Sequence, residues 1–192
     1  FGMYNMIVTK MRAVGIRVPI MIDADNWGQS EKNILAVGPR LLHADPEHNL
    51  LFSIHMWWPS ERHDAKTTGF ATVQERVTAC LEKSVEIKLP LVVGEFAPMA
   101  VAGAREIPYR HIMGECERLN IGWLCWSWGP GNSDSPEMDM TEHGSYNTLV
   151  KAFVSSCGVF PNDRTKTGHF YTEDKWTWEA LYGGVYGQYA TR

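Results

Sequence analysis

The stretch PLVVGEFAP, Pro90 to Pro98, places a short apolar run directly before Gly94 and the carboxylate of Glu95. A run of this kind, entered through a proline, is typical of a strand buried on both faces, and such strands belong to parallel sheets covered by helices. Glu95 would then end the strand at its carboxyl end. In barrels of alternating strands and helices that end carries the chemistry, so the stretch predicts a fold class and a candidate catalytic carboxylate.

Other segments repeat this form, in which a stretch with helical periodicity is followed by a short apolar run that ends in polar or aromatic residues. The alternation is typical of parallel strands joined by crossover helices. We predict strands over residues 19–27, 49–59, 90–96 and 121–130. We predict helices over residues 3–14, from Ser30 onward with a kink or a break at Pro39, over 72–88, from Pro108 to Leu119, and around 149–154.

The predicted strand-helix units are half of the eight that a closed barrel needs in roughly 250 residues. We therefore expect an α/β fold of the (β/α)8 TIM-barrel type, of which residues 1–158 hold about the last four strand-helix units, a half barrel. Residues 159–192 are rich in Gly, Tyr and Trp without a clear period and form an unassigned C-terminal extension. Open sheet edges would need covering, so a missing N-terminal half-barrel is a candidate partner.

The composition narrows the class of protein. With 192 residues, 44% of them hydrophobic and 21% charged, the chain suits one globular domain. The formal charge of -4 without a basic cluster argues against nucleic acid, and no apolar run is long enough to span a membrane. The cysteines are widely spaced, which argues against a zinc site and favours buried free thiols: Cys80, Cys116, Cys125 and Cys157. Disulfide status and oligomeric state stay open.

Residues able to handle a polar, ring-shaped ligand end every predicted strand. They are Asp23, Asp25, Asn26 and Trp27 after the first, His55, Trp57 and Trp58 after the second, Glu95 after the third, and Trp126 and Trp128 on the fourth. Taken singly, each has a structural explanation, such as a core histidine or tryptophan or a helix-capping carboxylate. Because they recur at the same end of successive strands, we favour a functional role for Glu95 with His55 and Trp126.

A retaining glycosidase uses one carboxylate as nucleophile and a second as acid/base, roughly 5 Å away across the scissile bond. Glu95, with aromatic faces nearby to stack on sugar rings, suits the first role. For the second role Asp23 and Asp25 are possible, but aspartates are also expected at a junction between a strand and a loop. No Asn-Glu pair occurs in the chain.

Several motifs occur in a fixed order: MIDADNWGQS (21–30), LLHADPEHNLLFSIHMW (41–57), LPLVVGEF (89–96), IGWLCWSWGPGN (121–132) and MDMT (138–141). Together they resemble the fifth to eighth strand regions of glycoside hydrolase family 5, especially its bacterial endo-mannanase-like members, over roughly residues 1–150. The resemblance implies a barrel of the retaining clan in which Glu95 is the nucleophile and His55 the active-site histidine. It also implies that Trp126 forms an aromatic platform and that Trp27 faces the substrate.

The chain departs from the family pattern in two places. Trp57 stands where the family commonly has a tyrosine that donates to the nucleophile, and its indole N–H could donate from a larger ring. The family's acid/base glutamate, in an Asn-Glu pair, and its arginine and histidine from earlier strands would lie before Phe1. We therefore expect this chain alone to be inactive.

The resulting hypothesis is the C-terminal half of a retaining endo-β-1,4-glycosidase, with mannan preferred over cellulose or a related glucan. Catalysis would rest on Glu95, His55 and Trp57, and the sugar would be contacted by Asn26, Trp27, Trp58, Trp126 and Trp128. The resemblance implies no metal or organic cofactor, and it implies secretion. The alternative is a non-catalytic carbohydrate-binding or assembly half-barrel. A dehydrogenase-like open sheet ranks last because no G-x-G-x-x-G loop follows any strand.

Overall fold

The computed structural model describes residues 1–97, 99–100, 105–124 and 126. They fall into two compact units. The first contains Phe1–Trp58, Arg62–Phe96 and His111–Leu124, and the second contains the described residues of Pro59–Glu61, Ala97–Arg110 and Cys125–Arg192. The predicted helix around 149–154, Trp128 and the extension 159–192 lie outside the described residues.

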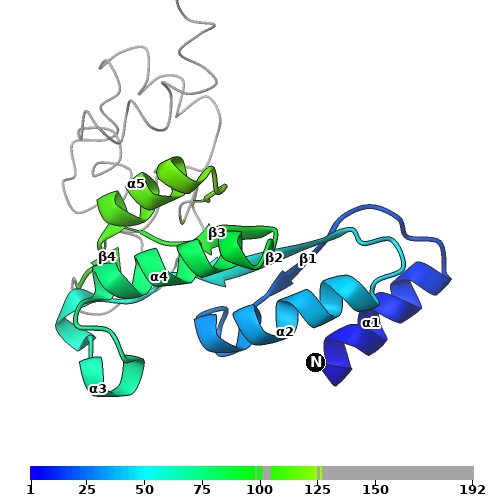
Figure 1. Cartoon of the computed structure of the whole chain (residues 1–192), viewed down its shortest axis with the longest axis horizontal. Coiled ribbons are helices and arrows are strands. Elements are labelled where there is room, and N and C mark those ends of the chain that lie inside the picture. Colours follow the sequence, from blue (N-terminus) through cyan, green and yellow to red (C-terminus); the bar gives the residue numbers. More distant parts are fainter. Residues whose placement is uncertain (98, 101–104, 125, 127–192) are drawn as a thin grey trace, which may run out of the picture. The chain divides into compact units, whose positions relative to one another are not determined.

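The described elements alternate between helix and strand for most of the chain (Figure 1). In order they are α1 (Gly2–Ala13), β1 (Ile20–Asp23), α2 (Glu31–Ala44), β2 (Leu50–His55), the 3-10 turn η1 (Ser60–Arg62), α3 (Ala65–Thr68), α4 (Val73–Glu86), β3 (Leu91–Glu95), β4 (Met99–Ala100), β5 (Arg105–Glu106) and α5 (Tyr109–Leu119). No helix among these residues is long and apolar enough to cross a membrane.

The first unit is built on a parallel sheet with the strand order β1-β2-β3. Each strand lies within a segment predicted from the sequence, so the parallel α/β class is confirmed. In the described part of the fourth predicted strand, Trp123 forms a parallel bridge with Val93. The Val93 N–H donates to Gly122 and the Leu124 N–H donates to Val93, both at 2.9 Å. Of the rest of that segment, only Trp126 is described.

The helices follow the predicted periodicity. α4 begins after Thr72, whose hydroxyl accepts the Glu75 N–H at 3.1 Å as an N-terminal cap. α1 ends where Gly15 takes a φ of 89°, which glycine adopts without a steric penalty. The predicted break at Pro39 is wrong, because α2 runs unbroken through it. Ile34 and Leu41 are buried on either side of Pro39, and this packing holds one continuous helix.

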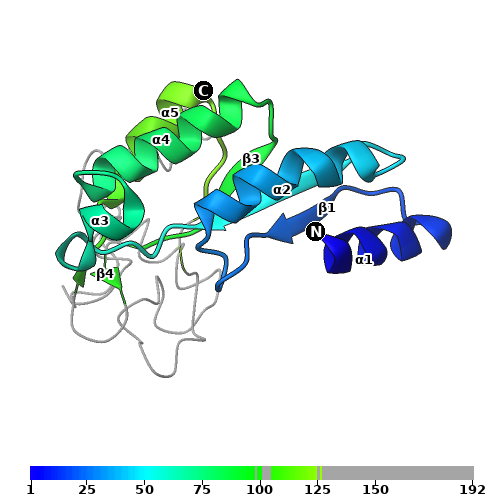
Figure 2. The same cartoon turned by 60° about the horizontal axis from the view of Figure 1, so that its bottom comes forward.

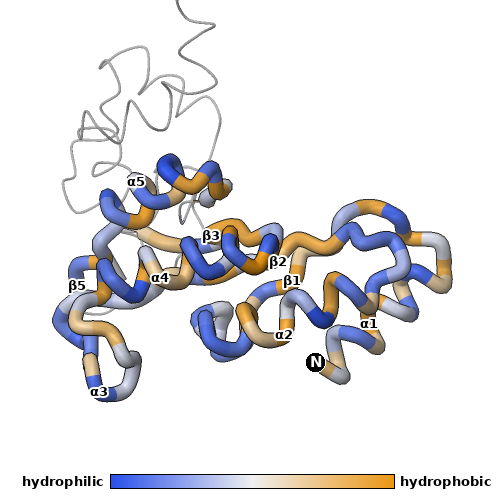
Figure 3. Tube along the Cα trace, viewed as in Figure 1, coloured by the Kyte–Doolittle hydropathy of each residue, from blue (hydrophilic) through white to orange (hydrophobic). Residues whose placement is uncertain are grey.

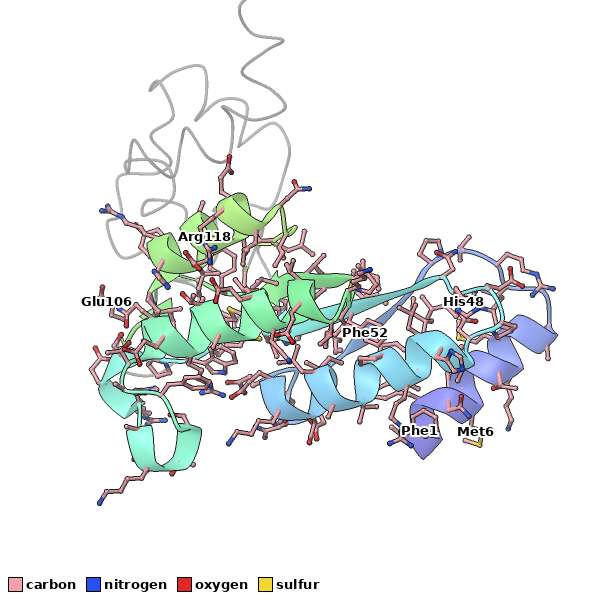
Figure 4. All side chains as sticks on the ribbon, in the orientation of Figure 1. Phe1, Met6, His48, Phe52, Glu106 and Arg118 are labelled. Carbon is pink, nitrogen blue, oxygen red and sulfur yellow. The ribbon has the colours of Figure 1, made fainter. Side chains whose placement is uncertain are left out.

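The core of the first unit lies between the sheet and the helices that cover it. Figures 1 and 2 show α2 and α4 side by side over the strands, and Figure 3 shows long apolar stretches along β2 and β3. Phe52, labelled in Figure 4, lies on the middle strand and is fully buried. Burial raises the pKa of the Cys80 and Cys116 thiols to about 12, so these two are buried free thiols as predicted.

In the second unit, β4 and β5 form a short antiparallel pair, with Met99 opposite Glu106 and Ala100 opposite Arg105. The sequence pattern did not predict this pair, because strands of two residues carry no readable alternation.

Candidate active site

The carboxyl ends of three neighbouring strands bring one histidine between two carboxylates. Asp23 ends β1, His55 ends β2 and Glu95 ends β3, and His55 lies opposite Glu95 in the strand register. The Nδ1 atom of His55 is 3.2 Å from Oε2 of Glu95, and its Nε2 atom is 3.3 Å from Oδ1 of Asp23. The parallel sheet thus gathers chemistry-bearing side chains at one edge, as the strand-end pattern predicted.

Glu95 accepts a hydrogen bond from the segment that follows His55. The indole N–H of Trp57 donates to Glu95 Oε2 at 2.9 Å. The same oxygen faces His55 Nδ1, so both neighbours meet Oε2. Within the described residues Oε1 receives neither contact. A carboxylate fixed through one oxygen keeps the other available to a ligand.

Backbone contacts fix the histidine ring in this place. The pairing of β2 with β3 shifts register between Ile54 and His55, and beyond the shift the Met56 N–H donates to the Glu95 carbonyl at 2.8 Å. The His55 N–H donates to the Gly28 carbonyl at 2.7 Å. A Cβ on Gly28 would lie 2.4 Å from Cγ and Nδ1 of His55, so the loop after β1 covers one face of the ring.

Two glycines are therefore site residues that the sequence reasoning missed. Gly28 has a φ of 78° as well as the close approach to His55. A Cβ on Gly94 would lie 2.1 Å from Oγ of Ser53, which is buried on β2, and 3.4 Å from Cδ2 of His55. A glycine inside a strand pattern, directly before Glu95, is a signal for such close approach.

The loop that follows β1 presents an aromatic ring to solvent. Asn26 and Trp27 have φ values of 53° and 57°, and the chain continues into Gly28, so three successive residues adopt a left-handed backbone. Such conformations are uncommon for residues other than glycine and gather at functional sites. Trp27 is 89% exposed, so a sugar ring could reach the indole.

Trp58, predicted to contact sugar, does not present its ring to solvent. It is 5% exposed, and the Arg76 guanidinium carbon lies 3.8 Å above its ring centre. Arg76 in turn donates from Nε and Nη2 to the two carboxylate oxygens of Glu31, at 3.0 and 2.6 Å. Because its ring is covered, Trp58 is a packing residue that ties the end of β2 to α2 and α4.

Asp25 has its hydrogen-bond partner on a helix and not at Glu95. Asp25 accepts from the amide of Asn33 on α2 at 2.6 Å. Trp126 is 36% exposed and belongs to the second unit. Among the described residues no three His, Cys, Asp or Glu side chains are grouped to hold a metal ion.

Comparisons with known proteins agree on one family. The family model described as cellulase, glycosyl hydrolase family 5, matches residues 1–132. A mannan endo-1,4-β-mannosidase from Salipaludibacillus agaradhaerens is 30% identical over 72% of this chain and 41% of its own length. The catalytic domain of a mannanase from Streptomyces sp. SirexAA-E superposes with a TM-score of 0.61 at 32% identity, over 75% of this chain and 42% of that one.

A further solved structure is that of a β-mannanase from Streptomyces thermolilacinus with mannohexaose, with a TM-score of 0.58 and 32% identity over 72% of this chain and 41% of that one. The chain therefore spans about two fifths of the length of the relatives it matches. The parallel sheet with its helices fits part of a barrel of this kind.

Proposed function

The chain belongs to glycosyl hydrolase family 5, and on that premise we propose that it carries the nucleophile side of a retaining endo-β-1,4-glycosidase that hydrolyses mannan in preference to cellulose. The observation that carries the proposal is the setting of Glu95 at the end of β3, where Trp57 and His55 meet the same carboxylate oxygen. This setting fixes one oxygen of the carboxylate and leaves the other to face a substrate.

In the proposed reaction, Oε1 of Glu95 attacks the anomeric carbon of the sugar. The bond from that carbon to the leaving oxygen breaks, and the leaving oxygen takes a proton from the acid/base carboxylic acid. The resulting ester between Glu95 and the sugar is then attacked by water, whose proton passes to the same acid/base group, now a carboxylate. The donor from Trp57 stabilises the charge that returns to Glu95 as the ester breaks.

We propose that the acid/base carboxylate comes from a segment or partner outside these 192 residues. In the chain itself Asp23 is engaged with His55, and Asp25 accepts from Asn33. Neither aspartate is placed across a scissile bond from Glu95 by any described contact. The proposal includes a further half-barrel as the source of this group, and low or absent activity for this chain alone.

The choice of mannan rests on the relatives, which are named mannan endo-1,4-β-mannosidases, and on the structure of one similar β-mannanase with mannohexaose. In this chain the exposed indole of Trp27 would stack on a sugar ring, with Asn26 beside it. We propose that Trp126 and Trp128 supply further stacking surfaces. A polysaccharide substrate is too large to enter a cell, which favours secretion of the enzyme.

Replacing Glu95 by Gln in the protein that carries this chain tests the proposal. The change keeps the shape but removes the nucleophile, so hydrolysis of mannan should fall roughly ten-thousandfold or more. Glu86→Gln is the matched control, because Glu86 is exposed and pairs only with Lys83 among the described residues. Reducing-sugar release should then be unchanged. Hydrolysis by the Glu95→Gln protein at the normal rate would contradict the proposal.

The second candidate is a non-catalytic carbohydrate-binding half-barrel. It is favoured by the lack of any Asn-Glu pair in the chain, because a binding module needs no acid/base group. Titration with mannohexaose separates the two candidates. Binding that survives Glu95→Gln, together with no product from the unmodified protein that carries this chain, would favour the binding module.

A further inference from the structure

The Asp23 carboxylate lies where it can act on the nucleophile through His55. Among the described residues, His55 is the one side chain within ion-pair distance of that carboxylate, at 3.3 Å. Glu95, by contrast, already accepts from Trp57 in addition to facing His55. The charged groups that face the His55 ring from the packed strands are these two carboxylates, Asp23 from β1 and Glu95 from β3.

Backbone from two neighbouring segments packs closely against the ring of His55. The main-chain N–H of His55 donates to the carbonyl of Gly28. Gly28 also lies so close to Cγ and Nδ1 of His55 that a methyl group on Gly28 would collide with the ring. The approach of Gly94 limits the ring on the side of Cδ2. Both ring nitrogens therefore have fixed partners, Asp23 for Nε2 and Glu95 for Nδ1.

A ring nitrogen that faces a carboxylate is satisfied only when it carries a hydrogen. A neutral imidazole has one such hydrogen, and the partner of each nitrogen determines which nitrogen holds it. Asp23 has no other described side-chain donor, whereas Glu95 has Trp57. We propose that Asp23 is a positioning residue that accepts a hydrogen bond from Nε2 of His55 and so fixes the orientation of the ring between the two carboxylates.

The expected effect of Asp23 on turnover rests on the proposed function. The spectroscopic test of its contact with His55 is independent of that function. In 15N-labelled protein, the Nε2 resonance of His55, assigned with His55→Gln, should have the shift of a protonated nitrogen. Asp23→Ala should move it toward the unprotonated value. Asp23→Asn keeps an oxygen acceptor at the same place, so the 15N chemical shift of Nε2 should stay close to its original value.

Kinetics on mannan supply the second readout. Asp23→Ala should lower kcat roughly tenfold to a hundredfold and leave KM within about twofold, because a displaced ring misaligns Glu95 without removing a sugar contact. Asp23→Asn should restore most of kcat. Unchanged 15N shifts and kcat in Asp23→Ala, or an Asn variant as slow as the Ala variant, would overturn the positioning role. If the protein that carries this chain lacks hydrolytic activity while Nε2 of His55 still responds to Asp23→Ala, the proposed function alone would be overturned.

Discussion

Trp57 donates a hydrogen bond to Glu95, a role that a tyrosine commonly has in the family pattern. The indole N–H is a donor only, so it cannot take a proton from the carboxylate or return one to it. Trp57 also reaches Oε2 at 2.9 Å, a normal length for a bond to an ionised acceptor. The site therefore keeps a donor for the carboxylate that we propose as the nucleophile.

Trp57→Phe should remove this donor while keeping an aromatic ring in place. A hydrogen bond to a charged group contributes about 1.5–3 kcal/mol, which corresponds to a loss in kcat of roughly tenfold to a hundredfold. Steady-state kinetics on mannan measure the change. Trp58→Phe is the comparison, because its indole N–H has no partner among the described residues and its ring packs under Arg76. That variant should change thermal stability more than kcat, and equal losses of kcat in both would contradict the role given to Trp57.

Some site residues could be read from the sequence and others could not. Asp23, His55 and Glu95 were predictable because parallel strands end at one sheet edge, and each residue directly ends an apolar run. Trp58, expected to contact sugar, is buried under Arg76, and alternation along a strand could not predict an arginine that comes from a distant helix. Gly28 was missed because its role depends on a ring that is 27 residues away in sequence.

At the scale of elements, a buried ion pair joins the helix α1 to the connection between α2 and β2. Arg12 donates from Nε and Nη2 to the two oxygens of Asp45, each at 2.9 Å, and also to the carbonyls of Ile16, Val18 and Asn49. Both side chains are almost fully buried. The pair thus fixes the segments that lead into β1 and β2, whose far ends carry Asp23 and His55.

This pair should make folding stability depend on acid pH. Hydrogen bonds from Arg12 lower the pKa of Asp45 to about 2, below its ordinary value of 3.8. The unfolded chain therefore takes up the proton first, so the stabilisation is complete above roughly pH 5 and is lost as the pH falls toward 2. Asp45→Asn should cost about 3 kcal/mol at pH 7 and flatten the acid side of the stability profile. Urea unfolding between pH 2 and 7 measures both effects.

Glu47→Gln is the control for this experiment, because Glu47 lies in the same connection but pairs with Arg17 at the surface. It should change the free energy of unfolding by less than about 1 kcal/mol. An acid profile of Asp45→Asn that keeps the slope of the unmodified chain would show that Asp45 does not set it.

Element positions were the part of the fold that the sequence predicted best. The helix predicted over 72–88 is α4, Val73–Glu86, and its cap Thr72 was within the predicted range. Pro39 does not break the helix as predicted. The burial of side chains on both sides of it stabilises α2 by more than the one missing backbone hydrogen bond costs. Periodicity describes one element at a time, and tertiary packing decides such conflicts.

At the scale of the molecule, β1 is an edge of the described sheet, paired only with β2. Met21 on this strand is 50% exposed, and Met3, Met6 and Val18 nearby in the sequence are exposed as well. Open edges and exposed apolar side chains are normally covered by further chain. Relatives more than twice as long as the matched region agree with the proposed half-barrel, in which this chain supplies the nucleophile and another segment the acid/base.

Covalent capture of the nucleophile in the protein that carries this chain tests that account most directly. An activated 2-deoxy-2-fluoro-β-mannoside should form the glycosyl ester and release it slowly, so the intermediate accumulates. Peptide mass spectrometry should then find the added sugar on Glu95, and Glu95→Gln should abolish the label. A label on another carboxylate, or no label from a protein that hydrolyses mannan, would contradict the assignment of Glu95 as the nucleophile.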